Sequence, residues 1–242
     1  MDIYGSTDIG RVRSSNQDTY RCGKLNDTAV YAVVCDGMGG ANGGNIASAI
    51  AADMLEKRVV SQYRVDMPEA SVLNMLESAA IAANIEVFDR ANADPELMGM
   101  GTTLIAVIAD HGRACVVHVG DSRVHHLSGD GLERITTDHS VVQEMILKGQ
   151  LTEEQAKNHP RKHFITRAIG VESDVRPDFD VFDIAEGDRI LLCSDGLTNM
   201  VSEDAIKELL RETDCAIVPA TLVETANRNG GEDNVTVVVI GC

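Results

Sequence analysis

Apolar runs of strand length come in consecutive groups along this chain, and helical patterns come in consecutive pairs between them. The strand-like runs are 29–35, 102–109, 113–119, 123–127, 178–184, 189–193 and 235–240. A chain that alternates single strands with single helices is typical of a parallel sheet, whereas grouped strands favour hairpins. Asp110, His111 and Gly112 separate two of these runs and predict a hairpin turn there. The order therefore favours antiparallel sheets.

The helical segments show apolar residues on one face. Ile46, Ile50, Met54 and Leu55 share a face in the first, and segment 72–87 repeats the pattern. Two more helices are expected late in the chain. One follows Ser202 as N-cap, with acidic residues in its first turn, and the other covers 215–228. We expect helix pairs that cover the sheets, all in one domain spanning 1–242.

Composition limits the class of partner. Apolar residues make up 44% of the 242 residues, enough for a substantial core. The formal charge is −17 with no run rich in Lys and Arg, so we expect no nucleic-acid partner, and a cation fits better. The six cysteines lack zinc-type spacing, and we expect free thiols in the cytoplasm. No apolar stretch reaches the length of a membrane span, so we expect no membrane partner.

Carboxylates stand at the ends of several strand-like runs. Asp36, Asp121 and Asp195 follow such runs, Asp233 precedes the last one, and Asp18 lies in the segment that leads into the first sheet. A single Asp beside Gly is typical of a turn. Rigid strand ends commonly position the residues of functional sites. The recurrence of the pattern therefore indicates that these carboxylates converge on one site.

Convergence would require a cation. Two carboxylates ~4 Å apart repel by about 4 kcal/mol at an effective dielectric constant near 20. All-oxygen ligands favour Mg²⁺ or Mn²⁺, and Gly37 would leave its backbone carbonyl accessible as a further ligand. Arg13 alone would be an ordinary surface cation, but it lies five residues before Asp18.

These residues, in this order, resemble the metal-dependent protein phosphatases of the PPM type, known as protein phosphatase 2C, and in particular their compact bacterial members. The strings that carry the resemblance are TDIGRVRSSNQD, VVCDGMGG, MGTTL, VGDSR, TTDHS, LLCSDGL and GGEDNVTVVV. They cover nearly the whole chain. The resemblance implies an α+β fold, a four-layer α-β-β-α sandwich of two antiparallel sheets flanked by pairs of antiparallel helices. It also implies that residues 139–170 form a flap.

The resemblance implies roles for individual positions. Asp36 is expected to bridge two metal ions and hold the attacking water, with the Gly37 carbonyl completing one metal site. Asp195 and Asp233 would complete the other site. Three further roles are implied: Asp18 acts through metal-bound water, Arg13 clamps the substrate phosphate, and Asp121 with Asp195 holds a third metal ion, as in bacterial relatives.

One departure concerns the general acid. Family members often carry a histidine in the glycine-rich loop, either directly after the Asp-Gly pair or a few residues on. Here those positions hold Met38 and Ala41, with Asn42 beyond. Protonation of the leaving group is therefore expected to fall to metal-bound water, and no protein acid is assigned.

The sequence thus predicts a Mg²⁺- or Mn²⁺-dependent protein serine/threonine phosphatase in which a metal-bridging water attacks directly, without a phosphoenzyme. Expected partners are phosphorylated proteins and a cognate Ser/Thr kinase, and we expect a monomer. An aspartyl-phosphate enzyme of the haloacid dehalogenase kind is a rival, but Cys193 stands where its nucleophilic Asp would be. The other alternative is a non-catalytic regulatory protein with the same fold.

Overall fold

Two antiparallel sheets lie face to face in the computed structural model, which describes residues 1–129 and 131–242, with side chains except at 40–42. The first sheet has the order β1 (Asp2–Asp8), β11 (Val235–Gly241), β10 (Arg189–Cys193), β7 (Arg123–Ser128) and β8 (Gly131–Arg134). The second has the order β2 (Asp18–Lys24), β3 (Val30–Met38), β5 (Leu104–Asp110), β6 (Arg113–Val119) and β9 (Asp178–Asp183), and β4 (Gly101–Thr102) pairs with the end of β3. Every pairing is antiparallel, as the grouping of the strands predicts.

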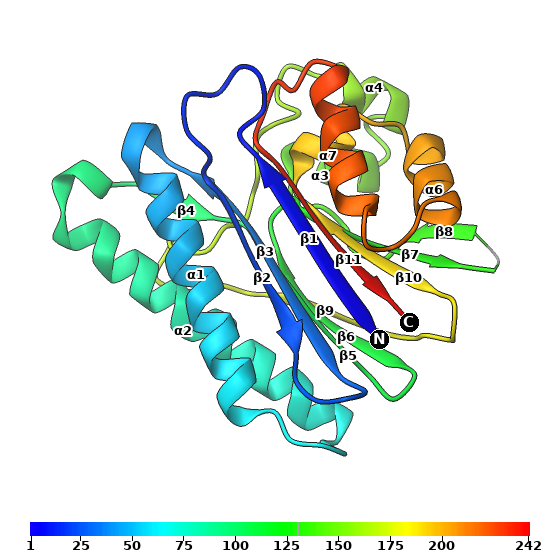
Figure 1. Ribbon diagram of the computed structural model, residues 1–242. Helices are drawn as coiled ribbons and strands as arrows, with labels where there is room; N and C mark the ends of the chain where they lie inside the picture. Colours follow the sequence, from blue (N-terminus) through cyan, green and yellow to red (C-terminus); the bar gives the residue numbers. More distant parts are fainter. Residues whose placement is uncertain (130) are drawn as a thin grey trace.

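Helices cover the outer face of each sheet (Figure 1). The long helices α1 (Gly40–Gln62) and α2 (Glu69–Ala93) pack on the second sheet. On the first sheet lie α6 (Glu203–Glu212), α7 (Val218–Arg228) and the short α5 (Asp195–Thr198). The remaining helices are η1 (Pro95–Leu97), α3 (Val141–Leu147) and α4 (Glu153–Lys157). The predicted four-layer α-β-β-α sandwich is confirmed.

Strand β3 is apolar at nearly every position because both of its faces are covered. Tyr31, Val33 and Cys35 pack toward the helices, whereas Val30, Ala32 and Val34 face the other sheet. A strand covered on both faces needs no alternation of polar and apolar residues. Because residues two apart share a face, Asp36 continues the row that faces the other sheet. The carboxylate therefore stands at the end of the layer between the sheets.

The predicted hairpin between β5 and β6 is confirmed. Asp110 pairs with Arg113, and the two residues between them have positive φ, 47° at His111 and 80° at Gly112. Two central residues of positive φ match the twist of antiparallel strands. The turn lies at the end of the sandwich opposite the strand ends that carry Asp36 and Asp18.

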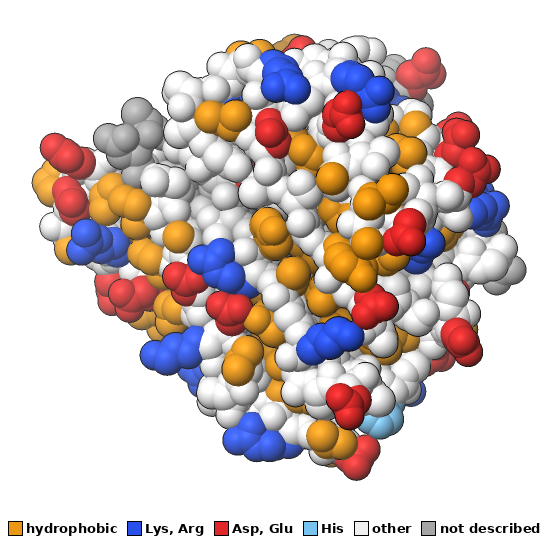
Figure 2. Space-filling model, viewed as in Figure 1, with side chains coloured by type: hydrophobic (Ala, Val, Ile, Leu, Met, Phe, Trp, Pro, Cys, Tyr) orange, Lys and Arg blue, Asp and Glu red, His pale blue; other side chains and the backbone are white. Residues whose placement is uncertain are grey.

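Several elements differ from the sequence-based expectation. Strands β1, β2 and β8 were not predicted, and α1 begins at Gly40 rather than within the apolar pattern near Ile46. Helices α3 and α4, which lie in segment 139–170, were likewise not predicted. Figure 2 shows hydrophobic side chains running down the middle of the face where β1 and β2 lie in Figure 1. Within residues 1–129 and 131–242, no helix combines the length and apolar character needed to cross a membrane.

Candidate active site

Asp36 stands at the end of β3, where hydrogen bonds fix its backbone. Its amide donates to the Thr103 hydroxyl at 2.9 Å, and its carbonyl accepts from the Thr103 amide at 2.9 Å and from the Thr102 hydroxyl at 2.9 Å. Thr103 in turn contacts the Ser122 hydroxyl at 2.8 Å. The two threonines of MGTTL therefore position the central carboxylate of the site.

Gly37, the next residue, has no room for a side chain. A Cβ there would lie 2.1 Å from the Gly44 carbonyl oxygen in α1 and 2.6 Å from the Gln17 carbonyl oxygen. The Gly37 amide donates to that Gln17 carbonyl at 3.1 Å. Glycine thus allows helix α1 and the β1–β2 loop to approach the end of β3 closely.

Asp18 is the register partner of Asp36 on β2, and the residue is 7% exposed. Its Oδ2 accepts from the Ser194 hydroxyl at 2.8 Å, whereas its buried Oδ1 accepts no hydrogen bond from any described residue. Ser194 also contacts Thr236 on β11, whose amide donates to its hydroxyl at 3.0 Å. Asp18 is therefore joined to the other sheet at the point where both sheets end.

Asp195 and Asp233 come from the first sheet. Asp195 opens α5 directly after Ser194, and its Oδ2 accepts from Asn199 at 3.0 Å, while its buried Oδ1 has no partner among the described residues. Asp233 precedes β11, and its Oδ2 accepts from the Arg13 guanidinium at 2.7 Å. The predicted phosphate clamp thus already lies against a predicted metal ligand.

Asp121 follows Gly120 in the turn between β6 and β7, and that turn is tied to the start of segment 139–170. The Gly120 amide donates to Nδ1 of His139 at 3.0 Å, and the His139 amide donates to the Gly120 carbonyl at 2.8 Å. Since Nδ1 accepts, Nε2 carries the proton and donates to Asp178 at 3.1 Å. His139 therefore joins segment 139–170 to the loop that carries Asp121.

These side chains meet at one cavity of about 550 Å³. The predicted site residues that line it are Arg13, Asp36, Gly37, Asp121, Asp195 and Asp233. Asp18 does not line the cavity; it is buried and accepts a hydrogen bond from Ser194. The fold thus brings residues as far apart in sequence as Arg13 and Asp233 to one cavity.

The carboxylates strongly affect one another. Burial, together with the charges of Asp195 and Asp233, raises the pKa of Asp18 to about 7. Burial and the charge of Asp195 raise the pKa of Asp121 to about 8. Burial, followed by the neighbouring Asp18 charge, holds the pKa of Asp36 well above its usual range, and burial also raises that of Asp195. Clustered acids with raised pKa values are the electrostatic environment that a bound divalent cation relieves.

The donor set fits divalent cations that prefer oxygen. Two buried carboxylate oxygens, Oδ1 of Asp18 and of Asp195, have no partner among the described residues, and the Gly37 carbonyl is a backbone oxygen beside Asp36. Mg²⁺ and Mn²⁺ bind such oxygens. Over residues 1–129 and 131–242, no three His, Cys, Asp or Glu side chains already stand in an arrangement that would hold a metal ion. Asp233 already pairs with Arg13 at 2.7 Å.

Sequence reasoning missed several residues of this site. Asn234 fixes the β1–β2 loop, because its side chain accepts from the Gln17 amide at 2.8 Å and donates to the carbonyls of Ile9 and Ser15. Its position directly after Asp233 was the available signal. Lys162 and His163 also line the cavity. No local pattern marks them, because their place depends on the path of segment 139–170.

Comparison with known proteins agrees with the fold. The sequence profile of the family described as protein phosphatase 2C matches residues 10–224. The serine/threonine phosphatase stp of Listeria innocua is 37% identical over 235 residues, covering 97% of this chain and 93% of the relative. This chain belongs to the protein phosphatase 2C family.

Solved structures extend the likeness to three dimensions. The serine/threonine phosphatase PstP/Ppp of Mycobacterium tuberculosis superposes with a TM-score of 0.88 at 36% identity, covering 98% of this chain and 97% of that one. A structure of the PstP catalytic domain in complex with two manganese ions superposes with a TM-score of 0.85 at 36% identity, covering 98% and 96%. The family is metal-dependent, and its fold accounts for nearly all of this chain.

Proposed function

We propose that this protein is a serine/threonine phosphatase that hydrolyses phosphoserine and phosphothreonine in proteins with two bound Mg²⁺ or Mn²⁺ ions. The observation that carries the proposal is the convergence of Asp36, Asp121, Asp195 and Asp233 on one cavity beside Arg13. The Listeria relative is named as a serine/threonine phosphatase, and the PstP structure holds two manganese ions. The same chemistry would explain why acidic side chains are kept together here.

In this proposal Asp36 and the Gly37 carbonyl would hold one cation, and Asp36, Asp195 and Asp233 would hold the other. Asp121 with Asp195 would hold a third. When bound, such cations lower the pKa of water and draw negative charge from phosphoryl oxygens. Asp18, buried beside this centre, would act through water, with Oδ1, which has no partner among the described residues, as the proton acceptor. No step requires a protein nucleophile.

Arg13 would orient the substrate phosphate. Its guanidinium has five N–H donors and lines the cavity, and the contact with Asp233 at 2.7 Å involves one nitrogen, Nη2. The carboxylate raises the pKa of Arg13 above its usual value, so the group remains a cation. A planar cation of this kind binds two phosphoryl oxygens side by side.

The test is release of phosphate from a phosphothreonine peptide with Mn²⁺, beside a phosphotyrosine peptide of the same sequence. We expect hydrolysis of the first and little of the second. Asp36→Asn and Asp195→Asn should each abolish it, whereas Asp89→Asn, the same change on an exposed residue of α2, should not. Undiminished hydrolysis by both site variants would defeat the proposal. A calorimetric titration without Mn²⁺ binding would favour the non-catalytic alternative.

Further expectations belong to the same proposal. They are a single catalytic domain over 1–242 with a flap at 139–170, a monomeric state, a cognate Ser/Thr kinase and a cytoplasmic location without nucleic-acid or membrane partners. All six cysteines are free thiols, which is consistent with a reducing compartment. The net charge of −17 supports the exclusion of nucleic acid.

A further inference from the structure

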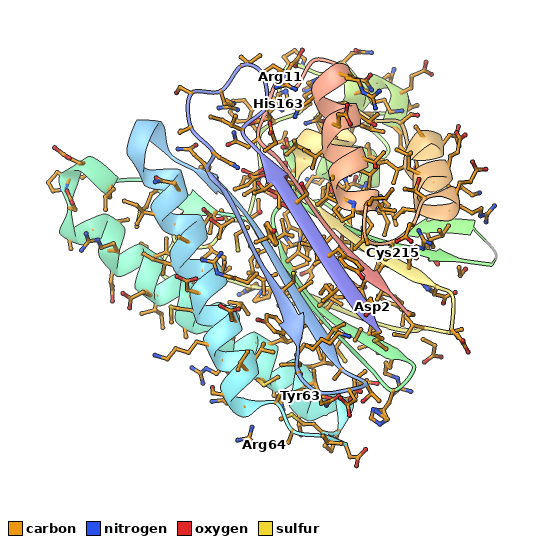
Figure 3. The ribbon with its side chains drawn as sticks, in the orientation of Figure 1. Asp2, Arg11, Tyr63, Arg64, His163 and Cys215 are labelled. Carbon is orange, nitrogen blue, oxygen red and sulfur yellow. The ribbon has the colours of Figure 1, made fainter. Side chains whose placement is uncertain are left out.

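Two segments that are far apart in sequence border the mouth of the cavity. The β1–β2 loop contributes Arg13, and the end of segment 139–170 contributes Lys162 and His163. Figure 3 places Arg11, from the same loop as Arg13, and His163 at the same end of the molecule. Arg161 directly precedes Lys162 in the chain. The mouth therefore has basic side chains on both of these segments.

Hydrogen bonds fix the turn that carries Arg161 and Lys162. The Lys162 amide donates to the His159 carbonyl at 3.1 Å, and the Arg161 amide donates to Nδ1 of His159 at 3.2 Å. The Phe164 carbonyl accepts from the Val141 amide at 2.9 Å, which ties the turn to the start of α3. The turn thus fixes the backbone that carries two exposed cations, of which Lys162 lines the cavity.

Three cations of these two segments have no ion-pair partner in the part of the chain that the structure describes. Arg11, Arg161 and Lys162, here called the cationic rim, form no ion pair with any described residue. Apart from the four aspartates of the site, Glu232 is the one carboxylate among the described residues that line the cavity. The described part of the lining thus holds five carboxylates and two cations, Arg13 and Lys162, and the cationic rim adds the exposed Arg11 and Arg161 near it in the chain. Exposed cations that lack a paired carboxylate attract negatively charged ligands.

We propose that the cationic rim binds carboxylate side chains that flank the phosphorylated residue. Preferred substrates are then phosphopeptides with Asp or Glu beside the phosphoserine or phosphothreonine. This inference rests on the proposed function, because Arg13 and the aspartates must first receive the phosphate. The rim lies outside that centre and supplies selectivity for the surrounding sequence.

The test uses three phosphothreonine peptides that differ only in the flanking residues, which are Glu, Gln or Lys. We expect kcat/KM to fall in that order, by about threefold for each Glu replaced by Gln, as for an exposed ion pair. The preference should shrink at high ionic strength because salt screens exposed charges. If none of the peptides is hydrolysed, the proposed function fails. If all three are hydrolysed equally, only the rim inference fails.

Charge-reversal variants test whether the preference for acidic flanking residues depends on the cationic rim. Lys162→Glu and Arg161→Glu should each lower the Glu-to-Gln ratio of kcat/KM to about one or below, by the same electrostatic reasoning. Lys57→Glu makes the same charge change on an exposed position of α1, roughly 25 Å along the helix from its start at Gly40, and should keep the wild-type ratio. Because each ratio is taken within one variant, a general change in turnover cancels. A wild-type ratio in both rim variants would overturn the inference.

Discussion

Asp18 and Asp36 are register partners on β2 and β3, so two carboxylates lie next to each other on the face of the second sheet that meets the first. Antiparallel partners place their Cβ atoms about 4.5–5.5 Å apart, and like charges directly opposite are unfavourable. Burial makes the repulsion stronger here. The repulsion at this end of the sandwich therefore lowers the stability of the metal-free protein, and bound cations would offset that loss.

This repulsion predicts a pH dependence of stability in the metal-free protein. The pKa of Asp18 is raised to about 7 in the folded state, above its unfolded value near 4. The folded state therefore binds more protons between these values, and stability falls as pH rises from about 4 to 7. Asp18→Asn removes the charge, so the variant should have the higher Tm at pH 8 and little advantage at pH 4.

Thermal melts with a chelator, at both pH values, measure this difference. Adding Mn²⁺ at pH 8 should raise the Tm of the wild type, because a ligand that binds only the folded state stabilises it, and should raise that of Asp18→Asn less. A variant that is less stable than wild type at pH 8 without metal would contradict the argument.

The close approach at Gly37 predicts a steric effect. In Gly37→Ala the new Cβ would meet backbone oxygens of Gly44 and Gln17, at 2.1 and 2.6 Å, which cannot rotate away. We expect a loss of about 1–3 kcal/mol in the free energy of unfolding, together with a loss of activity as Asp36 shifts. Gly129 provides a matched control, because a Cβ there meets no described atom within 4 Å. Equal urea midpoints for the two alanine variants would refute the steric account.

Arg13 should act mainly on substrate binding. Arg13→Ala is expected to raise KM for a phosphothreonine peptide by roughly tenfold, because a charged hydrogen-bond donor to the phosphate is lost, with a smaller change in kcat. Arg13→Lys should restore only part of the loss, since an ammonium cannot bind two phosphoryl oxygens in one plane. Steady-state kinetics separate these effects, with the exposed Arg90→Ala of α2 as control. An unchanged KM would remove the clamp role.

The central strands could be predicted from sequence, and three edge strands could not. Runs such as 113–119 and 189–193 coincide with β6 and β10, because strands covered on both faces are apolar throughout. Strands β1, β2 and β8 lie at sheet edges, where partly exposed polar residues interrupt the pattern. Their existence depends on pairing with neighbours.

Some residues of the candidate site could likewise be predicted from the sequence, and others could not. Four of its five aspartates could be predicted because each lies next to a recognisable strand. Asp18 lies in β2, which was not predicted, and only the familiar order of the motifs marked it. The supporting contacts could not, because Ser194 reaches Asp18 across 176 positions and Asn234 reaches the Gln17 amide across 217. Hydrogen bonds between residues so far apart arise from the packing of two sheets, which no local pattern encodes.

The last prediction concerns a cluster of one buried carboxylate, Asp138, and two guanidinium groups. Asp138, whose side chain is 8% exposed, accepts from Arg123 at 2.7 Å and from Arg134 at 2.7 Å. Asp138→Asn would leave two guanidinium groups together without a carboxylate, and breaking a buried pair in this way costs about 3–5 kcal/mol. We therefore expect a loss of that size in the free energy of unfolding, measured by urea denaturation.

A double variant separates this electrostatic cause from simple loss of packing. In Asp138→Asn combined with Arg134→Met, one of the two facing cations is gone, so the total loss should be smaller than the sum of the single losses. The exposed pair Lys148–Glu144 serves as control, and Glu144→Gln should change stability by at most about 0.5 kcal/mol. Strict additivity of the two cluster variants would show that the carboxylate does not hold the guanidinium groups together.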